Sequence, residues 1–406
     1  MSVPSISTPS SLSLTRSPLF VTGKNNTLAA DSLDSMTLQL KIFTGIKSLP
    51  AGSANYTLTK NYSIEEVINF EISDLIRSEF SHNFGVYNTQ GYAESPEGEV
   101  VWVAPLGDWT YSDNGAVPIE APFQTGVGLA FIATDGWAKM TNIAPTATTQ
   151  LLLTANTTRY AALGNYETIP LYNSVANDFG GISIRYSDNP STLYSFNTVG
   201  PSGGVPPDPA STDTQDLVIY AGVGPQNLES FLAGNSRPSQ HPTAEYYDVI
   251  FEETDGTPIT TVRYNLVCEP KYTPYQIGFI NRYGVAEYIT FFKKSTEQGN
   301  FTQDQYQKSI YNDGFTTPSL QVGKYQSYNV NSRNTLTLNT GFVDEGYSET
   351  IKDLLMSESV VVLSGGSWIS VVPQRGSVDY QKHINDKTIN YTVTFDYGFD
   401  ERSLVR

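Results

Sequence analysis

Hydrophobic and polar residues alternate in many short segments of this chain, which is the pattern that β-strands produce. The clearest segment is 388–399, "TINYTVTFDYGF". Large apolar or aromatic side chains occupy every second position from Ile389 to Phe399, and polar or small residues fill the positions between them. This alternation predicts a strand with one buried and one solvated face, as in an antiparallel sheet.

Similar segments occur along most of the chain. In residues 36–42, Met36, Leu38, Leu40 and Ile42 share one predicted face. We predict further strands in "VINFEIS", "EVVWVAPLG", "GVGLAFIATDGWAKM", "GISIRYSDN", "TLYSFNTV", "EYYDVIFEETDGTPITTVRYNLV" and "SVVVLSGGSWISVVPQ". Turn residues interrupt these segments at Asp135-Gly136, Asp255-Gly256, Asn281 to Gly284 and Gly365-Gly366.

Helical patterns are few and short. Ser73 is a predicted N-cap for one helix and Ser348 for another, because a serine hydroxyl can accept a hydrogen bond from the first helical turn. A third helical turn is predicted after the strand in "DLVIYAGVGPQNLESFL". The predicted inward side chains of the first two helices are Leu75, Ile76 and Phe80, and Ile351, Leu354 and Leu355.

These elements predict a mainly β protein with serial antiparallel β-sandwich or small-barrel domains and a few short helices. We predict a flexible N-terminal arm over 1–19, which is rich in Ser, Thr and Pro, and a β domain over 20–155. A β-rich middle region or insertion is predicted over 156–238, with a Pro/Gly linker at 200–215. The C-terminal β domain is predicted over 239–406.

Composition narrows the classes of function. The chain has 406 residues and a formal net charge of −17, and it has no cluster of Lys and Arg. Direct nucleic-acid binding is therefore not expected, because phosphate groups require clustered cations. No apolar run approaches the roughly 20 residues of a membrane-spanning helix, so no membrane insertion is expected. The N-terminus lacks the pattern of a signal peptide, which predicts synthesis and assembly in a cytoplasm.

Cys268 is the only cysteine, so an intrachain disulfide is excluded. A nucleophilic or zinc-binding role would require histidines close in space, and His82, His241 and His383 are widely separated in sequence. We interpret Cys268 as a small buried residue at the end of a strand. We assign no catalytic, cofactor-binding or metal-binding residue, and we expect no cofactor.

Three other patterns were weighed as sites. Gly222 and Gly224 follow a predicted strand, but the third glycine of a dinucleotide loop is missing and Pro225 follows at once. Neighbouring acids could act on sugars only if they faced the same side, which adjacent strand residues do not. These acid pairs are Glu65-Glu66, Glu252-Glu253 and Asp344-Glu345. The segments 187–190 and 311–315 lack the regularly spaced Asp and Asn ligands and the terminal Glu of a calcium-binding loop.

Aromatic residues give the one positive indication of function. The segments "GYAESPEGEVVWVAP", "GKYQSYNVNS" and "PKYTPYQ" combine rings with small polar residues. This composition suits protein contacts or carbohydrate stacking, although the rings could equally fill β cores. The hairpin at 275–292 carries apolar residues on both faces, interrupted by Glu287, and is predicted to be buried on both sides.

Two groups of segments carry a resemblance to a known family. "SPLFVTGKNNTLAADSLDSMTLQLKIFTG" with "YTLTK" and "INFEISDLIRSEF" resembles the N-terminal part of tail-associated virion proteins of tailed bacteriophages, chiefly those infecting Bacteroidota. "CEPKYTPYQIGFINRYGVAEYITFFKKSTE", "FVDEGYSETIKDLLMSESVVV" and "HINDKTINYTVTFDYGFDE" are similar to the C-terminal part of those proteins. The resemblance covers about half of the chain, and the middle, 155–240, departs from it.

The resemblance implies a structural component of a tailed-phage virion, in the tail, baseplate or neck. It also implies that copies of the chain form a ring or other symmetric oligomer beside other virion proteins, and it supplies no catalytic residues. Assembly would take place in the host cytoplasm, and the protein would then reside in the virion. The alternative is a receptor-binding or adhesion protein that recognises a host surface glycan. A third class, a cell-wall hydrolase, lacks a constellation of catalytic residues, and we expect no enzyme.

Overall fold

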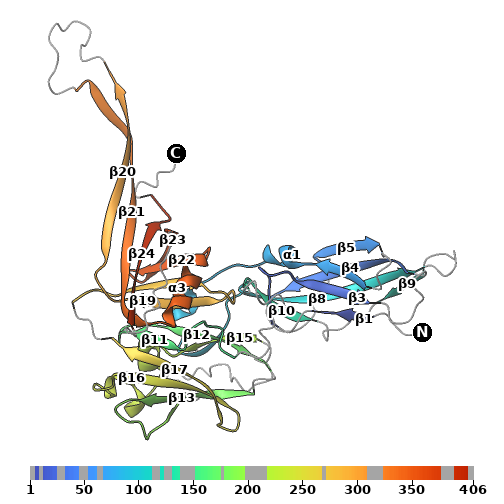
Figure 1. Cartoon of the computed structure of the whole chain (residues 1–406), viewed down its shortest axis with the longest axis horizontal. Coiled ribbons are helices and arrows are strands. Elements are labelled where there is room, and N and C mark those ends of the chain that lie inside the picture. The colour runs from blue at the N-terminus through green and yellow to red at the C-terminus, as the bar shows by residue number, and fades with distance from the viewer. Residues whose placement is uncertain are drawn as a thin grey trace. The chain divides into compact units, whose positions relative to one another are not determined.

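The computed structural model describes residues 5–8, 12–24, 33–44, 54–61, 67–111, 119–122, 130–137, 151–174, 178–196, 217–267, 271–308, 323–375 and 388–400. In this part of the chain the protein is mainly β, with strands arranged in several sheets and three short α-helices (Figure 1). Most neighbouring strands are antiparallel, as predicted, whereas β2 with β10 and β11 with β17 are parallel pairs. The predicted fold class is therefore confirmed.

The contacts divide the chain into two compact units. Unit 1 contains Met1–Cys268, Gly278–Ile289 and Gly346–Glu358, and unit 2 contains Glu269–Ile277, Thr290–Glu345 and Ser359–Arg406. This division is based on contacts in space and groups segments that are far apart in sequence. It therefore does not test the domain boundaries predicted after residues 155 and 238, which stay predictions.

The first part of unit 1 is a β-sandwich. One sheet has the order β2 (Leu12–Leu14), β10 (Phe131–Thr134), β8 (Val100–Tyr111), β4 (Leu33–Phe43) and β5 (Tyr56–Asn61), with β9 (Ile119–Pro122) also paired to β8. The other sheet has the order β1 (Ser5–Ser7), β3 (Phe20–Lys24) and β6 (Val67–Glu71). Both sheets contribute to one core, which includes the predicted row Met36, Leu38, Leu40 and Ile42.

The structure places two strands, β1 and β2, within the segment 1–19 that was predicted as a flexible arm. Leu12 and Leu14 are buried in β2, which pairs in parallel with β10, and Ser13 between them is also buried. Further upstream, β1 pairs with β3. The Ser- and Thr-rich composition concealed these strands, because two leucines are too few to produce a clear alternating pattern, whereas a sheet edge can bury them both.

The second part of unit 1 is built around another core. Its larger sheet has the order β11 (Thr158–Ala161), β17 (Pro258–Leu266), β16 (Tyr246–Glu253), β13 (Phe179–Tyr186) and β14 (Tyr194–Ser195). Its smaller sheet has the order β12 (Thr168–Asn173), β15 (Leu217–Gly222) and β7 (Gly91–Glu94). Side chains of both sheets and of α2 (Pro225–Phe231) pack into the same cluster, which makes this part a second sandwich-like layer pair.

The hairpin of β18 (Tyr275–Ile280) and β19 (Ala286–Phe291) is present as predicted. The Asn281 amide donates to the Val285 carbonyl at 3.0 Å, and Gly284 adopts a φ of 75°, which favours glycine. All six residues of β19 are buried, so the prediction that both faces are covered is confirmed.

Both helices that were expected to have serine caps exist, but neither prediction of the cap is correct. Helix α1 (Ser73–Arg77) follows Ile72 as N-cap, and the Ser73 hydroxyl donates to Glu71 instead. Helix α3 (Tyr347–Met356) follows Gly346, which places Ser348 inside the first turn. The N-cap residue lies one residue before the predicted serine in α1 and two residues before it in α3, so the serine hydroxyl is no longer at the capping position.

Unit 2 contains strands β22 (Val360–Ser364), β23 (Ser367–Pro373), β24 (Thr388–Tyr397), β21 (Tyr325–Asp344) and β20 (Thr296–Gln307), in that order within their sheet. Ile389, Tyr391, Val393 and Phe395 of β24 are buried, which confirms the alternation predicted for this segment. The predicted row extends too far, because β24 ends at Tyr397 and Phe399 is 65% exposed.

Candidate functional site

The most exposed regular structure in the described chain is a two-stranded ribbon in unit 2. Strand β20 pairs with β21 from Thr296 opposite Thr337 to Gln307 opposite Tyr325. Strand β24 pairs with β21 only from Thr335 to Asp344, so β20 and the first half of β21 continue beyond it (Figure 1). All twelve residues of β20 are exposed, and in the part of the chain that the structure describes, β20 is the last strand of its sheet.

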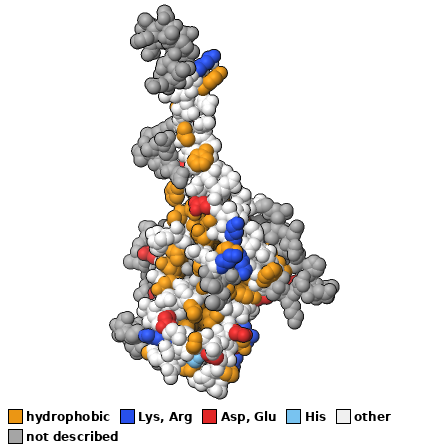
Figure 2. Space-filling view, turned by 90° about the vertical axis from the view of Figure 1, so that its left-hand side faces the viewer, with side chains coloured by type: hydrophobic (Ala, Val, Ile, Leu, Met, Phe, Trp, Pro, Cys, Tyr) orange, Lys and Arg blue, Asp and Glu red, His pale blue; other side chains and the backbone are white. Residues whose placement is uncertain are grey.

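Both faces of this ribbon carry aromatic side chains. Phe301 is 74% exposed and Tyr325 is 66% exposed, and the alternation along β20 places them on one face. Tyr306 and Tyr328 occupy the other face, where their rings meet edge to face at 5.7 Å. Figure 2 shows the ribbon as a mostly uncharged surface on which single hydrophobic side chains stand apart. Single exposed rings occur on many protein surfaces, and these four are accessible to another molecule.

The ribbon carries little charge for a chain with a net charge of −17. Its described residues from 296 to 308 and from 323 to 334 contain two acids and three bases. Strand β20 itself contains neither Lys nor Pro, the residues that usually protect an edge strand against pairing with another chain. The ribbon is therefore chemically suited to add a strand from a partner, through backbone hydrogen bonds, and to bury aromatic rings.

The second notable arrangement is a charged cluster buried inside unit 1. Arg159 of β11 lies with its Nη2 atom 2.6 Å from Oε1 of Glu287 on β19, and its Nη1 atom lies 3.5 Å from Oε1 of Glu167. All three side chains are at least 97% buried. Thr154 donates to Glu287 Oε1 at 2.9 Å, and Asn281 donates to Glu287 Oε2 at 2.7 Å.

Burial raises the pKa of Glu167 to about 8, although Arg159 acts to lower it. A buried guanidinium that serves two carboxylates links β11, the residue before β12, and β19 into one structure. None of the three residues lines the cavity described below, and each is closed to solvent. We therefore interpret the cluster as structural rather than catalytic.

A further buried carboxylate lies beside this hairpin. Glu99 is fully buried, and its Oε1 atom accepts hydrogen bonds from the Tyr220 hydroxyl at 2.5 Å and from the Ala286 amide at 2.7 Å. Burial raises the pKa of Glu99 to about 7, and the two hydrogen bonds only partly oppose this effect. Glu99 thus fixes the first residue of β19 to β15 within unit 1.

Asp135 joins two arginines and a histidine. Its carboxylate lies 2.5 Å from Arg16, 3.7 Å from Arg77 and 3.4 Å from His82. Burial acts to raise the pKa of Asp135, but hydrogen bonds from His82 and Arg16 dominate and lower it. Arg16 also pairs with Glu358 at 2.8 Å. This cluster secures the N-terminal segment after β2 and gives the half-buried His82 a partner.

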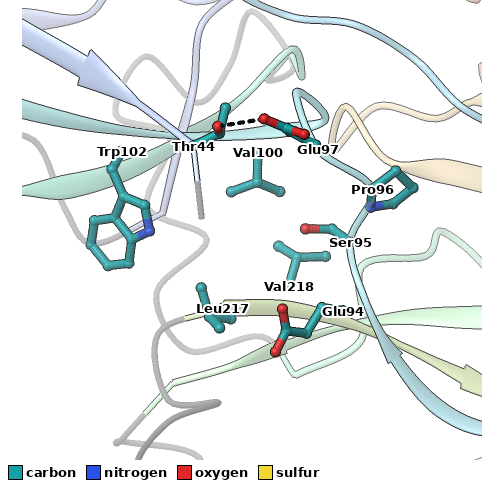
Figure 3. Close-up of a pocket in the computed structure, with 9 residues that line it drawn as sticks. All are labelled: Thr44, Glu94, Ser95, Pro96, Glu97, Val100, Trp102, Leu217 and Val218. Carbon is teal, nitrogen blue, oxygen red and sulfur yellow. Dashed lines mark hydrogen bonds between the residues drawn. The ribbon is translucent and has the colours of Figure 1, made fainter. Parts of the chain in front are cut away.

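A cavity of about 400 Å³ lies in unit 1 (Figure 3). Thr44 donates to Glu97 at its rim, at 3.2 Å. The Trp102 ring is almost fully buried, so it offers no open face on which a sugar could stack. The residues lining the cavity are Thr44, Glu94, Ser95, Pro96, Glu97, Val100, Trp102, Leu217 and Val218. They include no His, Cys or Lys.

Several sequence candidates lie outside the described residues, namely Cys268, His383, Glu65-Glu66 and segment 311–315. His241 is described, and it bonds to Asp188 at 2.8 Å and stacks on Tyr186 at 3.9 Å. His82 and His241 therefore have separate partners. In segment 187–190, Asp188 also accepts a hydrogen bond from Thr243, which explains this turn as local structure.

Gly222 and Gly224 have a packing explanation. A Cβ atom on Gly222 would lie 2.1 Å from the Thr89 carbonyl oxygen, and one on Gly224 would lie 2.3 Å from the Glu167 nitrogen. Helix α2 then begins at Pro225, so the predicted helical turn is confirmed. Of the acid pairs, Glu252 accepts a hydrogen bond from Ser183 at 2.8 Å.

The aromatic segments divide into two kinds. Tyr92 and Trp102 of the first segment are buried and fill cores, whereas Tyr325 and Tyr328 of the second are exposed on the ribbon. In the middle region, Tyr172, Tyr186 and Tyr220 are fully buried, and this observation gives no support to a stacking platform for glycans there.

Sequence reasoning did not single out β20. The signal available was a polar, Gln-rich segment of twelve residues that contains one isolated phenylalanine, and such a segment has no apolar period.

Comparison with known proteins does not assign the chain to a family. No protein-family model matches the chain, and no curated protein sequence matches it. Within the residues that the structure describes, no helix is long and apolar enough to cross a membrane. The same residues contain no group of three or more His, Cys, Asp or Glu side chains that could hold a metal ion.

Proposed function

We propose that this chain is a structural subunit of a multi-subunit particle, in which copies of it form a symmetric oligomer. The observation that carries the proposal is the exposed ribbon, since an isolated two-stranded hairpin is marginally stable in water and gains stability when a partner covers it. In this proposal the ribbon supplies the contact between copies.

The particle that we propose is a tailed-phage virion, with the protein in its tail, baseplate or neck. The support for this choice is the resemblance of the N-terminal and C-terminal segments to tail-associated virion proteins. A large share of Asn, Gln, Ser, Thr and Tyr on the ribbon suits such contacts, because these side chains form hydrogen bonds without a strong desolvation cost.

The test is incorporation into particles. We expect mass spectrometry of purified virions to detect the chain in several copies per particle. A variant in which residues 299–334 are replaced by a short Gly-Asn turn should keep the thermal unfolding midpoint of the native chain but fail to enter particles. Absence of the native chain from purified virions would refute the proposal.

The glycan-binding alternative rests on the sequence alone, because Tyr172, Tyr186 and Tyr220 of the middle region are buried. Binding of the purified chain to host surface polysaccharide, lost on Tyr325→Ser and Tyr328→Ser substitution, would favour it. Deletion of the middle region is not a suitable test, because it would remove core strands β11 to β15.

A further inference from the structure

The partner of the ribbon can be specified further. We propose that β20 pairs with β20 of a second copy of this chain, antiparallel and around a twofold axis, which gives a four-stranded sheet. This inference rests on the proposed function, because it names the contact through which copies associate.

The first argument is that β20 has an unprotected edge. No strand among the described residues pairs with its outer side, and every residue from Thr296 to Gln307 is exposed. An edge of this length without Lys, Pro or a buried cover readily adds a strand. A second copy of the chain is present wherever the chain itself is present. An antiparallel contact around a twofold axis uses the same surface on both copies, so β20 alone is sufficient to form it.

The second argument is charge. Two copies with a net charge of −17 repel each other, so a contact between them requires a surface with little negative charge. Strand β20 has only two acids, Glu297 near one end and Asp304 toward the other. In a pairing centred on Phe301, Glu297 lies opposite Gln305 and Asp304 lies opposite Gln298, so that each carboxylate meets an amide rather than another carboxylate.

The third argument is the position of Phe301. It is the most exposed of the large hydrophobic side chains in the described chain, and it lies near the middle of β20. A twofold axis at this position sets the two Phe301 rings side by side, as a cross-strand aromatic pair. The pairing then extends over residues 296–306, which uses almost the full length of the strand.

Cysteine cross-linking tests this geometry directly. The chain contains only Cys268, so a Cys268→Ser background gives a full-length protein without thiols. We expect Phe301→Cys in this background to form a disulfide-linked dimer under mild oxidation, since directly opposed Cα atoms lie roughly 4.5–5.5 Å apart. Glu297→Cys alone should not cross-link, but a mixture of the Glu297→Cys and Gln305→Cys proteins should.

Sedimentation equilibrium measures the strength of the proposed dimer. We expect the native chain to dimerise and Phe301→Lys to raise the dimer dissociation constant at least tenfold. Tyr325→Lys is the matched control, because it makes the same change on the same face at a comparably exposed residue of the other strand. It should leave the dissociation constant within about twofold of the native value.

A native chain that remains monomeric, or a dimer that shows no cross-link at any β20 position, overturns this inference. Either result would leave the proposed function standing as long as the chain is found in purified particles. Absence from particles would instead refute the proposed function, whatever the state of the isolated protein. Equal weakening of the dimer by Phe301→Lys and Tyr325→Lys would also contradict β20 pairing, because it would indicate a nonspecific effect of charge.

Discussion

Strands β19 and β20 follow each other in the chain with only four residues between them, yet their environments are opposite. Every residue of β19 is buried, and every residue of β20 is exposed. Each strand contains one residue that does not match its surroundings: Glu287 is a carboxylate in a buried strand, and Phe301 is a large apolar ring on an exposed one.

The two exceptions differ in where their partners lie. Glu287 is satisfied within the chain by Arg159, Thr154 and Asn281, because an unpaired buried carboxylate would destabilise the fold severely. Phe301 needs no internal partner, because water tolerates a single exposed ring. Glu287 thus belongs to a network within the chain, whereas Phe301 stays accessible for the contact that we propose.

The largest effect should come from removing the cation of the buried cluster. Arg159→Met leaves the Glu287 carboxylate buried without its counter-charge and should lower the free energy of unfolding by about 3–5 kcal/mol. Urea denaturation followed by tryptophan fluorescence measures this loss. Arg185→Met is the control, because Arg185 also pairs with an acid, Asp248, but its side chain is 40% exposed. This substitution should lower the free energy of unfolding by less than about 1 kcal/mol. Equal losses would contradict a special role for the cluster.

The next effect concerns pH and the anchor of β19. The pKa of Glu99 is about 7 in the folded chain against an ordinary value of 4.5, so Glu99 stabilises the fold fully below pH 4.5. That contribution is lost as the pH rises through 7, and it amounts to at most about 3 kcal/mol. Glu99→Gln should remove this decline between pH 5 and 8, as measured by denaturation at each pH. Glu94 is exposed, so Glu94→Gln is the control and should show the same dependence of stability on pH as the native chain. If Glu99→Gln also showed the native dependence, Glu99 would not be the group responsible for the decline.

The smallest effect should come from the ribbon. Phe301→Ala should change the free energy of unfolding of the monomer by less than about 0.5 kcal/mol, because the ring is exposed. Phe291→Ala, the same substitution ten positions earlier, empties a site in the core beside Phe395 and should cost about 3–5 kcal/mol. Thermal unfolding of dilute protein measures both. A large loss for Phe301→Ala would show that the ribbon supports the fold itself.

Local patterns allowed most strands to be predicted, because alternation in β24 and the turn glycines at 365 and 366 depend on residues that are close in sequence. Glu287 was recognised as an interruption of an apolar row, but its partner was not, because Arg159 is 128 residues away. The helix starts were missed by one or two residues, since a serine hydroxyl can bond to other nearby groups. The ribbon was missed because its polar strands have no buried face to generate a period.

The parallel pairing of β2 with β10 also constrains the order in which the chain can fold. Leu12 lies opposite Ile132, so about 120 residues separate the two strands. At a translation rate of about 5–20 residues per second, β2 leaves the ribosome roughly 6–24 s before its partner exists. During synthesis β2 must therefore wait for β10, and the contact of Arg16 with Asp135 can form only after residue 135 has been made. Strand β1 has no such delay, because its partner β3 follows within about 20 residues.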